Sequence, residues 1–259
     1  MLSIGQVYLQ NYENQTRMCA DICLNGHGIT LWFGVDSKQQ HYLCSARSDA
    51  FVMALLPTAM REGHDIVCET PVSSRLKYQL EYYLIPALTS VGDWYRPISI
   101  RAPIEEQKVQ NSGGIGLGFC GGVDCSYSLT KHSADSAYPV THLTVFNLGM
   151  FEGEAFRTSF LKACENSGVF AEKNNLELVA LDSNITEVLP ERYPDVCSFR
   201  NLSGALALQG LLSVYLLPLA HDYAEFSLDV HNSPKYDLLT VHCAQTESLT
   251  VYLSGSQIK

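Results

Sequence analysis

The second half of the chain alternates short apolar runs with longer amphipathic runs. Three short runs are rich in β-branched and aromatic residues and predict strands: Ile115–Phe119, His142–Leu148 and Leu176–Leu181. Three longer runs have helical spacing of their apolar residues: Val123–Lys131, Glu154–Lys173 and Leu202–Leu217. Strands that alternate with crossover helices predict a parallel sheet covered on both faces. Tyr223–Leu228 and Asp237–Cys243 are interpreted as two further strands.

The first half mixes strands and helices without strict alternation. Gly28–Val35 and Gln40–Cys44 have the composition of strands, and the pair Asn25-Gly26 predicts a hairpin turn before the first of them. Two helices are predicted: Ser48–Met60, with Ser48 as N-cap, and Ser73–Leu84, which Pro86 should end or kink. This pattern is typical of a small α+β unit.

A change in composition separates the two halves. Ala102–Gly114 is polar and contains few apolar residues, so it is interpreted as a linker. We therefore expect an α/β protein with three parts: a small α+β domain at 1–101, a linker at 102–114, and a parallel-sheet α/β domain at 115–259.

Composition narrows the classes of protein. A content of 46% hydrophobic and 17% charged residues is that of a folded globular chain. The net charge of −10 argues against binding to nucleic acid or to an anionic membrane. The longest apolar stretch, Ala205–Ala220, is interrupted by polar residues and Pro218, so no membrane span is expected. The N-terminus lacks signal-peptide features and the nine cysteines are an odd number, which indicates reduced thiols and a cytoplasmic location.

The segment Phe119–Cys125 has the composition of an anion-binding loop. It lies between a predicted strand and a predicted helix, where ligands bind in parallel α/β sheets. The adjacent Gly121 and Gly122 allow a tight turn that presents main-chain N–H groups, and the start of the following helix adds positive potential. A tight strand-to-helix turn without a ligand is the alternative explanation.

This loop, Cys120-Gly121-Gly122-Val123-Asp124-Cys125, resembles the pyrophosphate loop (PP-loop) of the N-type ATP pyrophosphatases, whose pattern is Ser-Gly-Gly-x-Asp-Ser. The wider chain resembles a bacterial subgroup in which a small N-terminal domain precedes the loop. Further similar segments follow in the same order: Pro71–Leu76, Arg157, Leu181–Asn184, the small residues Gly204–Ala207, and Thr246-Glu247. The resemblance implies an adenine nucleotide alpha-hydrolase-like, Rossmann-like domain.

The resemblance also implies a reaction and a site. ATP adenylates a carboxyl or amide substrate, pyrophosphate leaves into the loop, and a nitrogen or sulfur nucleophile displaces AMP. The implied nucleotide-binding residues are Phe119, Cys120, Gly121, Gly122, Val123, Asp124, Cys125, Phe146, Asn147, Leu148, Arg157, Asp182 and Asn184. Among them, Asp124 would orient the loop or hold Mg²⁺, although capping of the helix explains it equally well. Core packing for Phe146 and solvent exposure for Arg157 are the corresponding alternatives.

Two departures from the pattern leave three functions open. Cys120 and Cys125 replace both serines of the pattern, and thiols are weaker hydrogen-bond donors than hydroxyls. The chain also ends at Lys259, soon after Glu247, whereas members of the subgroup continue. The first hypothesis is an ATP-dependent, AMP-forming ligase or amidotransferase-like enzyme with Asp124, Cys120 and Cys125 as catalytic residues. The second is a degenerate binding or assembly subunit, with a partner protein or as a homo-oligomer.

The third hypothesis is a cysteine-dependent enzyme that uses Cys120 or Cys125. A helix N-terminus lowers the pKa of a cysteine and so favours the nucleophilic thiolate. A Cys–His pair would need a nearby histidine, and topology leaves four candidates: His142, His221, His231 and His242.

Overall fold

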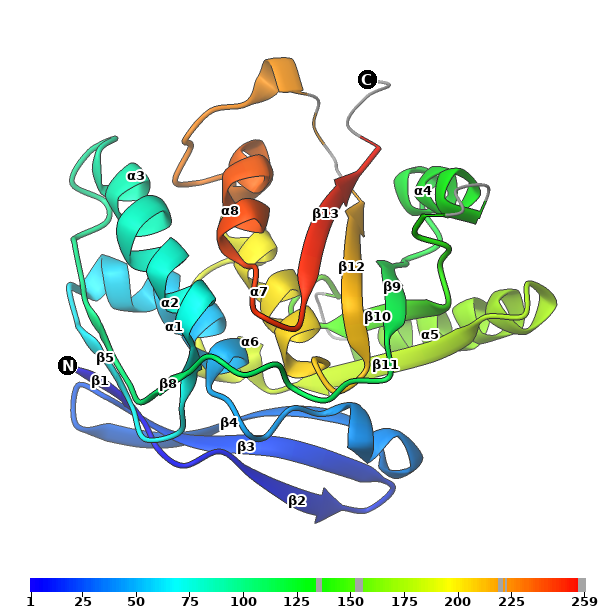
Figure 1. Ribbon diagram of the computed structural model, residues 1–259, viewed down its shortest axis with the longest axis horizontal. Helices are drawn as coiled ribbons and strands as arrows, with labels where there is room; N and C mark the ends of the chain where they lie inside the picture. Colours follow the sequence, from blue (N-terminus) through cyan, green and yellow to red (C-terminus); the bar gives the residue numbers. More distant parts are fainter. Residues whose placement is uncertain (134–136, 152–155, 219–220, 222, 256–259) are drawn as a thin grey trace.

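The computed structural model describes residues 1–133, 137–151, 156–218, 221 and 223–255. Within these residues, an 11-stranded mixed sheet runs through the whole molecule, with helices on both faces (Figure 1). Its strands in the first half are β1 Leu2–Ile4, β2 Tyr8–Tyr12, β3 Gln15–Leu24, β4 His27–Asp36, β5 Ile66–Cys68 and β7 Ile100–Arg101. Those in the second half are β9 Gly114–Gly118, β10 His142–Asn147, β11 Glu177–Ser183, β12 Leu212–Pro218 and β13 Thr250–Ser254. A separate pair joins β6 Val72–Ser73 to β8 Ile104–Glu105.

The second half forms a continuous parallel sheet in the order β11-β10-β9-β12-β13. Its first strand in sequence, β9, lies in the middle. The chain adds β10 and β11 on one side of β9 and then returns to add β12 and β13 on the other side. The predicted α/β class with a parallel sheet is therefore confirmed. The point between β9 and β12, where the order changes direction, is where such sheets bind ligands.

The sheet extends across the predicted domain boundary. Strand β4 pairs antiparallel with β11, with Gly34 opposite Asp182 and Phe33 opposite Ser183. The larger hydrophobic core likewise contains buried residues of both halves. The division into domains at 1–101 and 115–259 remains a prediction, and the sheet and the core both continue through it.

Helices cover the two faces of the sheet. They are α1 Asp49–Glu62, α2 Ser74–Gln79, α3 Ile85–Thr89, α4 Val123–Ser133, α5 Phe156–Lys173, α6 Ile185–Val188, α7 Tyr193–Ala207 and α8 Asp237–Cys243. Helix α1 packs against α7, and nearly all of its residues are buried because it lies between other elements. Helices α4 and α5 pack on β9, β10 and β11 over a smaller core that includes Leu117, Leu143 and Leu216.

Most predicted elements of the parallel half are confirmed. Strands β9, β10 and β11 and helices α4 and α5 lie within two residues of their predicted ranges where described, and positions 154–155 lie outside the described residues. In the first half, β4 and α1 are confirmed. So is the Asn25-Gly26 turn, where φ is 53° and 80°, the left-handed values that a tight hairpin requires.

Four predicted elements are wrong. The range Gln40–Cys44 is not a strand, because a 3₁₀ helix spans Ser37–Tyr42 and is capped by the Asp36 carboxylate, which accepts from the Lys38 N–H. The range Leu202–Leu217 is not one helix, because α7 ends at Ala207 and β12 begins at Leu212. The residues on the two sides of the boundary, Leu202–Ala207 and Leu212–Leu217, are nearly all buried, so the spacing of apolar residues does not reveal the boundary.

The two predicted strands near the C-terminus are also wrong. Tyr223–Glu225 is a 3₁₀ turn. Asp237–Cys243 is helix α8, which follows a 3₁₀ turn at Ser233–Tyr236. The buried positions of α8 include Asp237, Thr240 and Val241, three to four residues apart, which is the period of a helix and not of a strand.

The helix predicted at Ser73–Leu84 is longer than expected. Ser73 caps its start by accepting from the Leu76 N–H, and the helical path continues past Pro86 to Thr89. A π-helical segment at Leu80–Leu84 precedes Pro86. Proline lacks an N–H and its ring crowds the carbonyl four residues earlier, so a wider turn at this point lets the helix continue.

Candidate functional site

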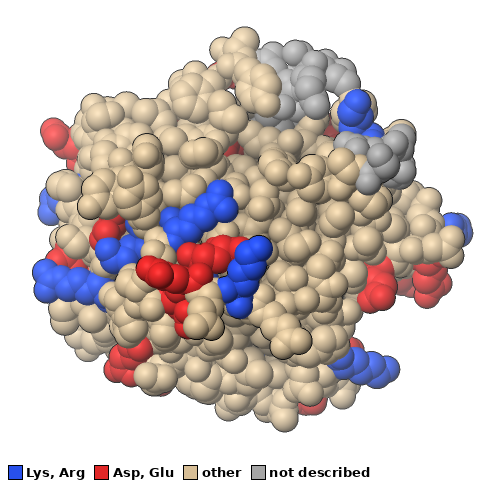
Figure 2. Space-filling view, viewed as in Figure 1, with Lys and Arg blue, Asp and Glu red and all other residues tan. Residues whose placement is uncertain are grey.

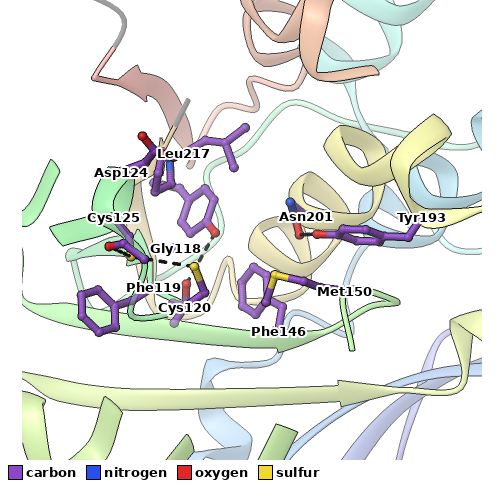
Figure 3. A pocket seen from close by; sticks show the side chains of 14 residues that line it. Gly118, Phe119, Cys120, Asp124, Cys125, Phe146, Met150, Tyr193, Asn201 and Leu217 are labelled. Carbon is purple, nitrogen blue, oxygen red and sulfur yellow. Dashed lines mark hydrogen bonds between the residues drawn. The ribbon is translucent and has the colours of Figure 1, made fainter. Parts of the chain in front are cut away.

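A cavity of about 260 Å³ lies at the carboxyl ends of β9, β10 and β12 (Figure 3). It is therefore located where the strand order changes direction. Its lining comprises Gly118, Phe119, Cys120, Gly122, Asp124, Cys125, Thr144, Phe146, Met150, Tyr193, Asn201, Tyr215, Leu217 and Pro218. The loop Phe119–Cys125, defined by the sequence as the candidate phosphate loop, supplies one wall, and we refer to it below as the loop.

Strand β9 brings the loop close to β12 because alternate positions in it are glycine. A Cβ atom at Gly116 would lie 2.7 Å from a Leu212 methyl, and one at Gly118 would lie 2.9 Å from the Tyr215 hydroxyl. Side chains of β12 occupy the space that larger residues in β9 would need. These glycines consequently set the distance between the loop and the opposite wall of the cavity.

The glycine pair of the loop faces open space. Gly121 has φ +80°, a left-handed conformation that residues with a Cβ rarely adopt, and a Cβ built there meets nothing within 4 Å. A Cβ at Gly122 meets only the Cys120 sulfur, at 3.4 Å. The conformation of the main chain, and not crowding, explains why position 121 is glycine.

The two loop cysteines lie side by side. Their sulfur atoms are 3.9 Å apart, and the Cys125 thiol also donates to the Gly122 carbonyl oxygen at 3.1 Å (Figure 3). Cys120 is exposed, whereas Cys125, in the first turn of α4, is 2% exposed. Both line the cavity.

The surroundings of the two thiols give them different pKa values. The hydrogen bond from Cys120 lowers the pKa of the Cys125 thiol to about 6, and the main-chain amides of Cys120, Gly121 and Gly122 contribute in the same direction against the effect of burial. The same sulfur–sulfur hydrogen bond, together with burial, raises the pKa of Cys120. Cys125 is therefore the more acidic of the two thiols.

Asp124 lines the cavity from the start of α4. Across the described residues, no group of three or more His, Cys, Asp and Glu side chains is arranged to hold a metal ion. A magnesium ion that takes most of its ligands from phosphate oxygens and water needs only one or two carboxylates. Asp124 fits that more limited role.

The structure brings together about half of the residues predicted from the sequence. Those that line the cavity are Phe119, Cys120, Gly122, Asp124, Cys125 and Phe146. Gly121 lines a neighbouring cavity on the other side of the loop, between α4 and α5. Val123 is 85% exposed. Phe146 also stacks on Tyr215, with ring centroids 5.9 Å apart, so it contributes both to the core and to the cavity wall.

The remaining predicted residues lie elsewhere. Asn147 donates to the Asp182 carboxylate at 2.6 Å, and these two residues line separate cavities beside the first. Asn184 accepts from the Trp32 N–H at 3.0 Å and donates to the Thr30 carbonyl at 2.8 Å. Its amide thus joins β11 to β4, which is a structural role.

Leu148 and Arg157 are also outside the cavity. Leu148 is fully buried, and its carbonyl oxygen accepts from Arg200 at 3.2 Å. Arg157 is exposed on α5 and lines none of the cavities found among the described residues.

Sequence reasoning missed the opposite wall of the cavity. Tyr215 and Leu217 come from β12, Thr144 from β10, and Tyr193 and Asn201 from α7. The Tyr193 hydroxyl donates to the side-chain Oδ1 of Asn201 at 3.2 Å (Figure 3). The signal that identifies Tyr215 is the run Ser213–Leu217, which has strand composition but was included in a predicted helix.

None of the four candidate histidines lines this cavity among the described residues. His142 lies at the opposite end of β10, near Glu177, and burial lowers its pKa. His221 contacts Glu225, and His231 contacts Trp94. The geometry therefore provides no Cys–His pair at the loop.

A second polar cluster joins the two halves of the chain and does not line the loop cavity. Arg47, 2% exposed, contacts Glu247 at 2.7 Å and also donates to the Gln107 carbonyl. Asp49, fully buried, accepts from the Ser73 N–H at 2.8 Å and from Gln209 at 2.9 Å. We call Arg47, Asp49, Gln209 and Glu247 the buried network.

This network unites two of the segments on which the resemblance rests. Glu247 accepts from the Arg75 N–H at 2.9 Å, and the Thr246 hydroxyl donates to Gln209 at 2.7 Å. Pro71–Leu76 and Thr246-Glu247 thus meet in space. They hold elements together and do not reach the loop cavity.

The visible surface carries no extended basic area. On the face drawn in Figure 2, acidic and basic side chains are interspersed, and wide areas between them carry neither charge. None of the described helices is long and apolar enough to cross a membrane.

No protein-family model, curated protein or solved structure matched the chain in the comparisons. The site must therefore be interpreted from its own geometry.

Proposed function

We propose that the loop binds the phosphate groups of ATP, and that the protein is an ATP-dependent, AMP-forming ligase or amidotransferase-like enzyme. The resemblance to the PP-loop superfamily with its Rossmann-like domain is part of this proposal. The observation that carries it is the loop itself. The main-chain amides of Cys120, Gly121 and Gly122 help to lower the pKa of Cys125 in the first turn of α4, beside a cavity at the switch point of the parallel sheet.

Each wall of the cavity has a role in this proposal. The amides of Gly121 and Gly122 would hold the β- and γ-phosphates, and Asp124 would hold Mg²⁺. The apolar wall formed by Phe146 and Leu217 would contact the less polar part of the nucleotide. ATP would supply the adenylyl group that activates a carboxyl or amide oxygen of the second substrate.

The acceptor would enter from the adjoining cavity of about 620 Å³, which shares Tyr193 with the first. Arg200 lines this second cavity and is 2% exposed. Its guanidinium donates to the carbonyl oxygens of Leu148 and Glu191. A buried cation held by carbonyl dipoles favours an acceptor with a negative charge, such as a carboxylate.

The alternative function is a binding or assembly subunit that has the fold but no turnover. One observation favours it: both serines of the resembled pattern are replaced by cysteine. A thiolate at Cys125, whose pKa is lowered to about 6, would compete with phosphate for the same amides. A third function, catalysis by a loop cysteine, is supported by the lowered pKa of Cys125 but not by a histidine at the cavity.

Calorimetric titration with ATP–Mg²⁺ tests the proposal. We expect the reduced protein to bind, and the Cys120→Ser/Cys125→Ser variant to bind about tenfold more tightly or better, because hydroxyls donate to phosphate and carry no competing charge. Gly26→Ala serves as a matched control, since Gly26 has the same φ of +80° but lies in the β3–β4 turn. Binding by the double variant alone would favour the assembly subunit. Absence of binding by both proteins would refute a nucleotide site.

A further inference from the structure

The loop contains two thiols in an arrangement that the proposed reaction does not require. Cys120 and Cys125 flank the glycine pair, and their sulfurs are 3.9 Å apart. Formation of a disulfide needs the sulfurs to approach to about 2 Å. Gly121 and Gly122 lie between them in open space, so the main chain that must move is the part with the fewest steric restraints.

Both thiols are within reach of a small oxidant. Cys120 is exposed, and Cys125, although 2% exposed, lines the same cavity. Their sulfurs are in contact, so a sulfenic acid formed at either sulfur meets the other thiol directly.

We propose that Cys120 and Cys125 form a peroxide-sensitive dithiol that closes to a disulfide across the loop. The oxidation itself is independent of the proposed function, whereas its role as a switch of nucleotide binding rests on that function. The disulfide joins the end of β9 to the first turn of α4 and fixes the glycine pair between them. It also removes both thiols from the cavity wall.

The reaction balances with one peroxide. One of the two cysteines, as its thiolate, attacks one oxygen of hydrogen peroxide, the O–O bond breaks, and its sulfur becomes a sulfenic acid. The hydroxide that leaves takes up the proton that this cysteine lost on ionisation and becomes water. The sulfur of the other cysteine then attacks the sulfenic acid sulfur, the S–O bond breaks, and the second hydroxide leaves with the proton of the other cysteine as water. Two thiols and one peroxide give one disulfide and two waters.

Access and selectivity follow from the packing. Cys125 is 2% exposed, but it lines the cavity, and a peroxide is little larger than a water molecule. Among the described residues, no other two thiols are recorded as hydrogen-bonded to each other. Burial raises the pKa of other cysteines, to about 12 at Cys44, Cys68 and Cys243. These three are expected to react slowly.

Mass spectrometry of one tryptic peptide tests the proposal in the full-length reduced protein. Cleavage after Lys108 and Lys131 releases peptide 109–131, whose only cysteines are Cys120 and Cys125. After about one equivalent of hydrogen peroxide, we expect the peptide to take up no iodoacetamide and to be about 2 Da lighter than the reduced form. Reduction should restore two alkylation sites.

Matched variants test the pairing of the two thiols. Cys120→Ser and Cys125→Ser each leave one thiol, so each should stop at a sulfenic acid that dimedone traps and should form no disulfide within the peptide. Cys23→Ser, at an exposed cysteine of β3, should behave as wild type. The proposal is overturned if the wild-type peptide keeps two alkylatable thiols, or if dimedone traps the wild-type peptide as fully as it traps the single variants. Neither readout depends on nucleotide binding, so failure of the proposed function is recognised separately.

Discussion

The loop and the buried network both contain polar groups out of bulk solvent, yet they differ in what satisfies those groups. In the network, Asp49 and Gln209 bond to each other and to neighbouring groups of the chain, and neither residue lines the loop cavity. In the loop, main-chain amides lower the pKa of a cysteine that lines a cavity, next to a glycine in the left-handed conformation. Polar groups that are satisfied internally stabilise a fold, whereas those that face a cavity are available to a ligand.

The largest predicted effect is a loss of stability when the buried network is broken. Arg47→Ala leaves the carboxylates of Asp49 and Glu247 without their cation, so the free energy of unfolding should fall by about 3–5 kcal/mol. Urea denaturation measures this loss. Lys162→Ala, at an exposed position of α5, should change stability by less than about 0.5 kcal/mol. Equal stability of Arg47→Ala and wild type would show that the network is not structural.

The second prediction concerns the charge of the loop. At pH 8 the Cys125 thiolate competes with a bound phosphate, so Cys125→Ser should raise the affinity for pyrophosphate–Mg²⁺ about 30-fold. At pH 5.5, below the pKa of about 6, the thiol is neutral and the gain should nearly vanish. Calorimetry at both pH values provides the measurement. An equal gain in affinity at both pH values would show that the Cys125 thiolate does not compete with phosphate.

The third prediction uses the opposite pKa shifts of the two regions. Burial raises the pKa of Asp49 to about 6, so the folded state holds a proton that the unfolded state has released between about pH 4 and 6. This contribution to stability is complete at low pH and is lost as the pH rises through 6. We expect the loss to be of the order of 1–2 kcal/mol and to be absent in Asp49→Asn, measured by urea denaturation from pH 4 to 7.

Cys125 should show the reverse sign. Its pKa is lowered to about 6, so its contribution to stability is present at high pH and is lost as the pH falls through 6. Wild type and Cys125→Ser should therefore diverge in stability toward pH 9. If both variants retain the wild-type pH profile, the assigned electrostatics of the two regions are wrong.

The smallest expected effect is a conformational one. Gly121→Ala should cost about 1–2 kcal/mol of stability, because φ of +80° is unfavourable for alanine although space is available. Gly26→Ala has the same φ and the same open surroundings and should cost the same. Only Gly121→Ala should also weaken pyrophosphate binding, by about tenfold or more. Equal affinities of the two variants for pyrophosphate would show that the left-handed conformation at Gly121 is not needed for ligand binding.

Local signals predicted the loop but not the wall that faces it. Gly121 and Gly122 are adjacent in the sequence and lie between a strand and a helix, so local sequence is sufficient to predict that side of the cavity. Tyr215 is missed because the C-terminal part of α7 and strand β12 are both almost entirely buried, and hydrophobic periodicity does not distinguish helix from strand at such a boundary. Asp237–Cys243 was assigned to a strand because its run of apolar residues is short.

Hydrophobic periodicity does not predict which residues far apart in the chain contact each other. The contact of Arg47 with Glu247 and the bonds of Asn184 to β4 join residues far apart in the chain. The resemblance implies a ligand contact for Asn184, whereas the polar atoms of its side chain bond to the main chain of β4. Similarly, Asp182 is bonded to Asn147 and faces away from the cavity that the loop lines.

The central claim is that the amides of the loop receive an anion, and NMR of the ¹⁵N-glycine-labelled, reduced protein tests it most directly. On titration with pyrophosphate–Mg²⁺, we predict saturable shifts of the Gly121 and Gly122 amide signals and no shift of Gly26. The effect should be larger in Cys125→Ser at pH 8. Unchanged signals of Gly121 and Gly122 at millimolar pyrophosphate, in both proteins, would contradict the assignment of the loop as a phosphate site.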